Sequence, residues 1–375
     1  MNPFRYSEPV PPEELLDRDA EAAELLERAE DGNNSRLVAP RRYGKTSLLR
    51  RLIRDARAVG WNAVYVDFFG VLTAADIAER IERAYGAQLE GRVATWFAGA
   101  RRMLRPTVTA GGGPIPASAS VALNVQAEAP LLDRLALPAR AFERTGVRTL
   151  VVFDEFQDVL AARDRLDGTI RSEIQHHADA ASYVFAGSHL GMMRELFTDR
   201  RRAFYGQAGP VELPPLEAGD VAGHLAGRFA ATRRDVGEAL GPLLDTAAGH
   251  PQRTMLLAHL IWERTPPGGA ATHETWLEAY DHAMAVDVRD ELRAIWTALS
   301  ISQRRALTAI AADDGPLFGR AASRRHGGSR GGALQAAVRG LVDRGEVVED
   351  PGRTTGHRVV DPLLAAWVRG GRDGT

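Results

Sequence analysis

The chain has 375 residues, of which 45% are hydrophobic and 26% charged, as in globular proteins with a buried core, and this length suggests two or three domains. Its formal net charge of −2 excludes a global attraction to nucleic acid or membranes, so contact with nucleic acid would require a local basic patch. The lack of cysteine excludes disulfides, thiolate catalysis and cysteine-bound zinc, and it is compatible with the cytoplasmic location that we expect.

Neither export nor membrane insertion is indicated by the sequence. Residues 1–10 are polar and lack the apolar segment of a signal peptide. No uncharged apolar run approaches the roughly 20 residues that a membrane-spanning helix needs. We therefore expect no membrane partner.

Predicted helices and strands alternate over residues 1–215. This alternation predicts an α/β domain with a parallel sheet. The last long strands are continuous apolar runs, which are typical of a sheet covered on both faces. We expect helices at residues 13–30, 46–60, 73–84 and 131–144, and strands at residues 35–38, 62–68, 148–153, 182–187 and 210–213.

One segment of this domain departs from the alternation. Residues 106–128 contain three consecutive glycines, followed by apolar residues at every second position. This pattern indicates an inserted β-hairpin. A flexible linker fits the same composition, so both alternatives stay open.

The strand pattern stops after Pro215. Residues 216–299 are predicted to form a helical domain that is broken at residues 249–251 and 266–269. Residues 300–375 are predicted to form a third domain of helices followed by a hairpin, which is typical of a winged helix-turn-helix. Its expected helices are residues 303–312, 317–325 and 332–344, and its expected strands lie around residues 346–348 and 357–360.

Only one of the 47 Lys and Arg residues is a lysine, Lys45. It lies in the sequence A-P-R-R-Y-G-K-T-S at residues 39–47, between a predicted strand and a predicted helix. The pattern G-x-x-x-x-G-K-[ST] forms a loop whose N–H groups cradle phosphates and whose lysine reaches them as a compact charge. Ala39 replaces the first glycine of this pattern. An accidental G-K-T in an ordinary turn is the alternative, and the flanking strand and helix count against it.

We therefore predict a nucleotide-binding loop in which Lys45 also takes part in catalysis and the Thr46 hydroxyl binds Mg²⁺. Its residues are Pro40, Arg41, Arg42, Tyr43, Gly44, Lys45, Thr46 and Ser47.

Two carboxylates follow the buried strand at residues 148–153. Asp154 is expected at the carboxyl edge of the sheet as a second Mg²⁺ ligand, and Glu155 is expected to polarise the attacking water. Alone, a strand that ends in Asp-Glu can be a solvated strand end. Together with a phosphate loop about 110 residues upstream, it predicts a nucleoside triphosphatase.

The lysine count also bears on the nucleotide. The guanine-reading signature Asn-Lys-x-Asp needs a second lysine, which this chain lacks, so ATP is favoured over GTP. A protein kinase is disfavoured because the chain has neither His-Arg-Asp nor Asp-Phe-Gly.

Further motifs run through nearly the whole chain. They are N-P-F at residues 2–4, L-D-R-D-A-E at 16–21, the loop at 40–49, D-E-F-Q at 154–157, G-S at 187–188, G-H-P at 249–251 and D-P-L at 361–363. Together they resemble the archaeal-type ATPases, P-loop proteins of the STAND class that are related to AAA+ ATPases and to initiators of the Orc/Cdc6 type.

The resemblance implies roles for residues at matching positions. Ser188 matches a polar residue that senses the γ-phosphate, and His250 and Pro251 match an element through which the helical domain contacts bound nucleotide. Without the resemblance, the G-H-P sequence could equally be a helix-breaking turn. Arg18 matches a motif that packs near the nucleotide, although Asp17 stands where glycine is usual in that motif.

Three consecutive arginines follow the predicted sensor helix. One of them could be an arginine finger that reaches a γ-phosphate of its own chain or of a neighbour, and the second case implies self-association that depends on nucleotide. A solvated basic surface is the simpler interpretation. These residues are Arg200, Arg201 and Arg202.

The predicted winged-helix domain has a local positive charge of +3, from ten arginines and seven acidic residues between 303 and 361. Phosphate contacts to DNA would form at the entrance of its recognition helix, at Arg324, Arg325 and Arg330. Winged helices also bind proteins, so DNA and a protein both remain candidate partners. Salt distinguishes them, because phosphate binding weakens steeply as salt rises.

These observations predict a cytoplasmic, Mg²⁺-dependent ATPase that acts as a switch. Hydrolysis would change how the α/β and helical domains pack, and the winged-helix domain would present the output to its partner. One alternative is a module that keeps ATP bound without hydrolysing it, which the alanine at position 39 suggests. Another is a DNA-binding regulator with a vestigial phosphate loop.

Overall fold

The structure is a computed structural model that describes residues 1–375 except 90, 92–93, 99–128, 163–165, 319–330 and 372–375. The chain divides into two compact units. The sheet unit comprises Asp19–Val38 and Leu48–Glu212, and the helical unit comprises Met1–Arg18, Ala39–Ser47 and Leu213–Thr375. The hairpin predicted at residues 106–128 and most of the helix predicted at 317–325 lie outside the described residues.

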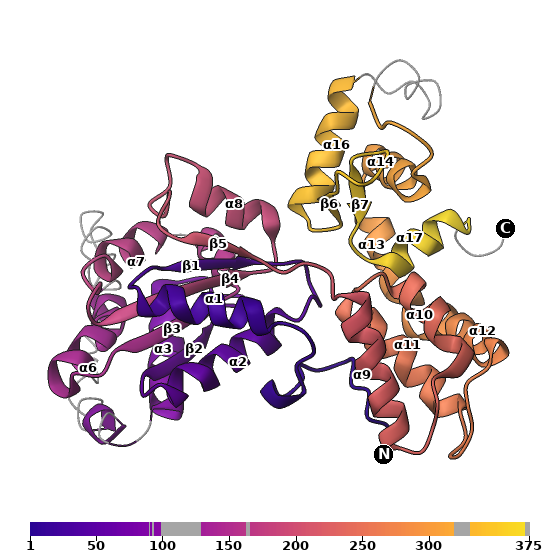
Figure 1. The fold of residues 1–375 in the computed structure, drawn as a ribbon. Coiled ribbons are helices and arrows are strands. Elements are labelled where there is room, and N and C mark those ends of the chain that lie inside the picture. The colour runs from indigo at the N-terminus through magenta and orange to yellow at the C-terminus, as the bar shows by residue number, and fades with distance from the viewer. Residues whose placement is uncertain (90, 92–93, 99–128, 163–165, 319–330, 372–375) are drawn as a thin grey trace, which may run out of the picture. The chain divides into compact units, whose positions relative to one another are not determined.

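A five-stranded parallel sheet forms the centre of the sheet unit (Figure 1). Its strand order is β2-β3-β4-β1-β5, so β4 lies between β1 and β3. Every residue of β3 and β4 is buried, as their continuous apolar sequences predict. The strands are β1 (Ser35–Val38), β2 (Asn62–Asp67), β3 (Thr149–Asp154), β4 (Ala181–Gly187) and β5 (Gly209–Glu212).

Helices cover this sheet on both faces. One face packs on an aromatic cluster in which the ring of Phe156 lies 4.7 Å from that of Phe185 and 6.0 Å from that of Phe153. Contacts of α1 with β1 and β4 cover the other face. The helices are α1 (Asp19–Glu30), α2 (Lys45–Ala58), α3 (Ala74–Gln88), α6 (Leu137–Thr145), η2 (Phe156–Leu160), α7 (Leu166–Ile174) and α8 (Leu190–Thr198).

Two predicted helices differ in their bounds from the expectation. The helix predicted at residues 13–30 starts at Asp19, because Asp17 and Arg18 have φ angles of 47° and 154° that no α-helix accommodates. The helix predicted at residues 131–144 is helical from residue 129 but is interrupted at residue 136, and it continues as α6 from Leu137, because Pro138 cannot continue the preceding turn.

The helical unit has one hydrophobic core. This core begins at Phe4, which packs on Phe229, and continues to the edge-on pair of Trp296 and Trp367. Its elements are α9 (Ala218–Ala231), α10 (Leu240–Ala247), α11 (Pro251–Arg264), α12 (His273–His282), α13 (Arg289–Ala298), α14 (Ile301–Ala312), α16 (Gly331–Asp343), β6 (Val347–Glu349), β7 (His357–Val359) and α17 (Pro362–Arg369).

The antiparallel pair β6 and β7 forms the predicted hairpin, and α14 and α16 lie at two of the three predicted helices of the C-terminal region. Asp313, just after α14, accepts hydrogen bonds from the hydroxyl of Thr354 and the N–H of Thr355. These contacts attach the β6–β7 turn to the end of α14.

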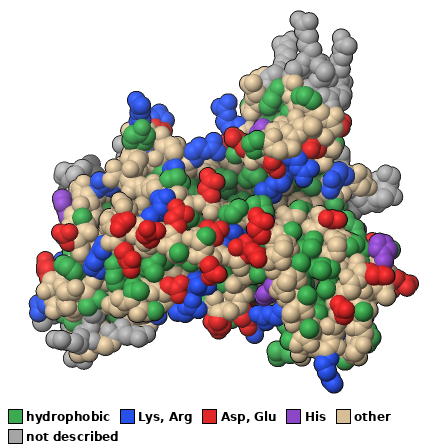
Figure 2. All heavy atoms as spheres, in the orientation of Figure 1, with side chains coloured by type: hydrophobic (Ala, Val, Ile, Leu, Met, Phe, Trp, Pro, Cys, Tyr) green, Lys and Arg blue, Asp and Glu red, His purple; other side chains and the backbone are tan. Residues whose placement is uncertain are grey.

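The charge pattern of the surface agrees with the low net charge. Figure 2 shows basic and acidic side chains interspersed over the visible face. Across the described part of the chain, no helix is long and apolar enough to span a membrane.

Candidate functional site

The loop at residues 39–44 joins β1 to α2, and two of its residues have left-handed backbones. These are Arg42, with a φ of 66°, and Gly44, with a φ of 85°. Left-handed residues at such spacing turn successive N–H groups toward one side and form concavities that bind anions. Ala39 is buried and does not have a positive φ, so its backbone conformation is accessible to alanine. The missing first glycine is therefore compatible with the loop.

Lys45 is the first residue of α2, directly after this loop. Its side chain is buried, at 6% exposure. The helix N-terminus carries a partial positive charge, which adds to the ammonium group in attracting an anion. Thr46 is half-buried, and the Ser47 hydroxyl accepts a hydrogen bond from the N–H of Val10 at 3.1 Å.

The carboxyl ends of β1, β4 and β3 meet at one edge of the sheet. Val38 at the end of β1 pairs with Gly187 in β4, and Phe153 in β3 pairs with Phe185 in the same strand. Asp154 therefore leaves the sheet at the edge from which the chain continues out of β1 into the loop. Ser188 follows β4 at the same edge.

Asp154 is buried, and its carboxylate accepts hydrogen bonds from Tyr65 and Glu155. Its Oδ2 accepts from the hydroxyl of Tyr65 at 2.6 Å, and its Oδ1 accepts from the N–H of Glu155 at 2.9 Å. Burial and the neighbouring Asp154 carboxylate raise the pKa of Tyr65, so its hydroxyl keeps its proton and donates. Tyr65 lies on β2, and nothing in the sequence marked it for this role.

Glu155 has a left-handed backbone, with a φ of 48°, and its carboxylate accepts hydrogen bonds from neighbouring side chains. Its Oε2 accepts from the hydroxyl of Ser188 at 2.8 Å and from the amide of Gln157 at 2.6 Å. The structure thus brings Ser188 and Glu155, two predicted site residues, into direct contact.

Gln157 has a part in the site that sequence reasoning did not assign, although the D-E-F-Q sequence contains it. A Cβ atom on Gly187 would lie 2.4 Å from the side-chain oxygen of Gln157. Any larger residue at the end of β4 would therefore require the side chains of Gln157 and Met193 to shift.

His250 lies against the phosphate loop and caps α11, in which Pro251 is the first residue. Its Nδ1 accepts from the N–H of Arg253 at 3.3 Å, and its ring packs edge-on to Tyr43 with 5.2 Å between ring centroids. Burial, above all, lowers the pKa of His250 to about 4, so the ring is neutral at pH 7. Gly249 has a φ of 73°, and a Cβ there would lie 2.6 Å from the carbonyl oxygen of Leu216.

The predicted arginine-finger residues lie after α8. Arg201 pairs with Asp199 at 2.7 Å, and Arg202 pairs with Glu195. Arg200 is exposed and shows no ion pair with the described residues.

Arg18, by contrast, is buried, and it donates to the carbonyl oxygen of Pro214 at 2.7 Å. The predicted DNA contacts Arg324, Arg325 and Arg330 lie outside the described residues.

No protein-family model and no curated protein matches the chain, whereas solved structures do. A Walker-type ATPase of Pyrococcus abyssi aligns over 98% of this chain and 99% of its own length, with 17% identity and a TM-score of 0.70. The Orc2 protein of Aeropyrum pernix, in ADPNP–ADP complexes, aligns over 98% of this chain and 96% of its own, with 18% identity and a TM-score of 0.59. At these identities the likeness concerns the fold, and the chain has the α/β fold of a P-loop nucleoside triphosphatase.

Proposed function

We propose that this protein binds ATP with Mg²⁺ at the loop of residues 40–47 and hydrolyses it as a regulatory switch. The observation that carries the proposal is the loop itself. It combines the only lysine of the chain with two left-handed residues directly before a helix N-terminus. Backbone N–H groups and a compact ammonium suit the phosphates of a nucleotide.

The proposal gives a role to each predicted polar residue. Lys45 neutralises charge on the β- and γ-phosphates, and the Thr46 hydroxyl and the Asp154 carboxylate hold Mg²⁺, an ion that prefers oxygen ligands. The hydrogen bond from Tyr65 orients Asp154. The ion supplies neutralisation of charge that develops on the phosphates.

Glu155 is the residue that orients and polarises the attacking water. The hydrogen bonds from Ser188 and Gln157 fix one oxygen of its carboxylate. We assign Ser188 to the positioning of Glu155 as well as to sensing the γ-phosphate, because its hydroxyl already donates to that carboxylate. Such placement matters because phosphoryl transfer relies mostly on positioning and charge neutralisation.

We assign the interaction with the partner to the C-terminal region. In the proposal, residues 300–375 form a winged-helix domain that follows a helical domain of residues 216–299. The hairpin β6–β7, attached to α14 through Asp313, supports this assignment. Its partner is DNA or a protein, and self-association dependent on nucleotide is part of the proposal. The salt dependence of DNA binding separates the two kinds of partner.

A module that holds ATP without hydrolysing it is the second candidate. The alanine at position 39, where the phosphate-loop pattern has glycine, suggests it. Binding of ATP is common to both candidates, and turnover separates them.

The test of ATP binding uses two variants of the single lysine. Equilibrium titration with a fluorescent ATP analogue and Mg²⁺ should show binding by the wild type and a loss of at least about 100-fold in affinity for Lys45→Ala. Lys45→Arg keeps the charge but replaces a compact ammonium with a broad, planar group, and we expect it to fail as well. Equal affinity of all three proteins would show that the loop does not bind the nucleotide.

A further inference from the structure

Arg42 occupies a backbone conformation that its side chain disfavours. Its φ of 66° lies in the left-handed region, which glycine adopts freely and arginine does not. A non-glycine residue persists in this region only where its surroundings hold it, and such residues concentrate at functional sites. Something in the structure must therefore hold Arg42.

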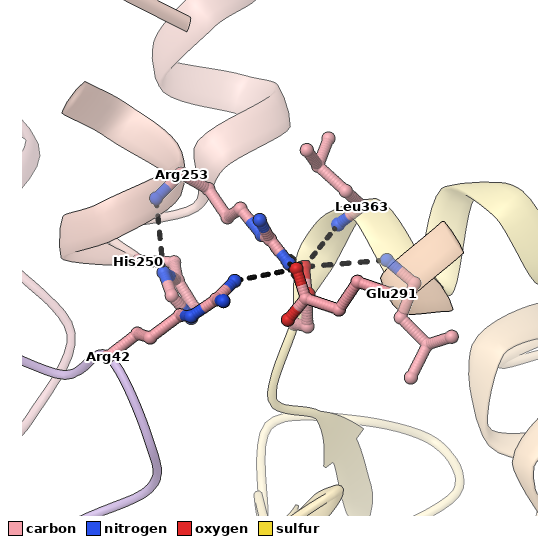
Figure 3. A network of polar contacts seen from close by, with 7 residues as sticks. Arg42, His250, Arg253, Glu291 and Leu363 are labelled. Atoms are coloured by element: carbon pink, nitrogen blue, oxygen red, sulfur yellow. Dashed lines mark hydrogen bonds and ion pairs between the residues drawn. The ribbon is translucent and has the colours of Figure 1, made fainter. Parts of the chain in front are cut away.

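Glu291, on α13, is an ion-pair partner of Arg42. Nη1 of Arg42 lies 2.6 Å from Oε2 of Glu291, and this ion pair joins residues 249 positions apart in the sequence (Figure 3). The Arg42 side chain is 47% exposed and therefore accessible from solvent. Both residues belong to the helical unit.

The same oxygen of Glu291 also accepts from a second arginine. Nη2 of Arg253 lies 3.2 Å from it, and Arg253 is only 1% exposed. Figure 3 shows the two guanidinium groups converging on this carboxylate from α11 and from the loop. Glu291 is thus shared between an exposed arginine of the phosphate loop and a buried arginine of the helical core.

Arg253 also contacts the residue that caps α17, the last helix of the described residues. Its guanidinium donates to both oxygens of Asp361, whose Oδ1 accepts from the N–H groups of Leu363 and Leu364 at the start of α17. Nη1 of Arg253 is buried and has no hydrogen-bond acceptor among the described residues. The carboxylates around Arg253 therefore leave part of its donor capacity unused.

We propose that Glu291 is an internal anion that competes with the phosphates of the bound nucleotide for Arg42. The inference rests on the proposed function, because it takes the loop to be the phosphate site. When a nucleotide occupies the loop, its phosphates take Arg42, and Glu291 is left to the buried Arg253. Occupancy of the loop then alters the network that caps α17.

Competition for one arginine makes the coupling reciprocal. If bound nucleotide changes how strongly Arg253 and Asp361 attach α17, then a change in that attachment changes nucleotide affinity. By thermodynamic linkage the two effects have the same size. Glu291 is in this sense a positioning residue: it acts on the nucleotide through Arg42.

Glutamine at position 291 tests the competition directly. Glu291→Gln removes the competing charge, so we expect ATP to bind about two- to five-fold more tightly, as suits a partly exposed ion pair. Asp290→Asn is the matched control, because it removes the neighbouring exposed carboxylate of α13, and its affinity should equal that of the wild type. Unchanged or weaker binding by Glu291→Gln overturns the inference.

Glycine at position 42 provides a second test that keeps the loop intact. Arg42→Gly removes the ion pair but adopts the left-handed conformation without strain. In this background, Glu291→Gln should no longer change ATP affinity. Hydrogen exchange at the amides of Leu363 and Leu364 should respond to ATP in the wild type and not in Arg42→Gly.

These outcomes are distinguishable from a failure of the proposed function. If the wild type and Lys45→Ala bind ATP equally, the phosphate site itself is refuted. If only the wild type binds, but Glu291→Gln has the same effect with and without Arg42, the phosphate site stands and the competition is refuted.

Discussion

The buried ring of His250 makes the stability of the helical unit depend on pH. His250 is 3% exposed, and burial chiefly lowers its pKa to about 4, whereas an unfolded histidine titrates near 6.5. Between these values the unfolded chain binds a proton that the folded chain does not. The contribution of neutral His250 to the free energy of unfolding is therefore fully present above about pH 6.5 and is lost as the pH falls toward 4.

Asparagine at position 250 should remove this dependence, because it keeps an N-cap acceptor for α11 but does not titrate. Between pH 7 and pH 5, the wild type should lose about 2 kcal/mol more unfolding free energy than His250→Asn. Urea unfolding followed by tryptophan fluorescence measures the difference, and the other histidines cancel because both proteins contain them. Parallel pH profiles would show that His250 does not carry the effect.

The places of residues that lie beside a strong local pattern could be predicted from the sequence. Lys45 and Asp154 stand beside a glycine-containing loop and a buried strand, and those patterns place them at the ends of α2 and β3. Tyr65 and Glu291 could not be predicted, because each meets its partner through the folding of distant segments. Tyr65 lies 89 positions from Asp154, and Glu291 lies 249 positions from Arg42.

Among the elements, α17 depends on a residue that serves two purposes. Asp361 caps the helix and also pairs with the buried Arg253. Burial is the largest influence on Asp361 and opposes its ionisation, but the hydrogen bonds and charge of Arg253, together with His250 and the N–H of Leu363, outweigh it and lower the carboxyl pKa. The pair therefore stabilises the fold fully above about pH 4 and is lost as the pH falls through the lowered pKa.

Asp361→Asn separates the two purposes, since asparagine caps a helix as well as aspartate does. The variant leaves the Arg253 charge poorly compensated in the core and should lose about 3 kcal/mol of unfolding free energy at pH 7. Asp350→Asn is the control, because Asp350 pairs with Arg358 near the surface, at 3.5 Å, and should cost less than about 1 kcal/mol. Equal losses in the two variants, measured by urea unfolding, would contradict the assignment.

Elements with a strong local pattern were predicted closely, and those set by backbone strain were not. The strands predicted at residues 182–187 and 210–213 are β4 (Ala181–Gly187) and β5 (Gly209–Glu212). The helix predicted from residue 13 begins six residues later, at Asp19. Apolar periodicity before Asp19 does not show that Asp17 and Arg18 turn the chain out of the helix.

At the scale of the whole molecule, the phosphate loop belongs to a unit that its position in the sequence does not suggest. Residues 39–47 and the N-terminal residues 1–18 group with the C-terminal residues 213–375. The amide of Asn2 donates to the carbonyl of His259, 257 positions away, and Tyr43 packs on His250. Such long-range contacts leave no local pattern, so the α/β fold was predictable and this grouping was not. The boundaries of the three predicted domains stay predictions.

Release of phosphate from MgATP tests the central claim most directly. The wild type should turn over ATP, and Glu155→Gln should lower the rate by about 100-fold or more while ATP binding persists, because the amide cannot polarise water as the carboxylate does. Both proteins are measured at saturating ATP, with and without DNA. A wild type that binds MgATP but releases no phosphate under either condition would contradict the account and leave a module that only holds the nucleotide.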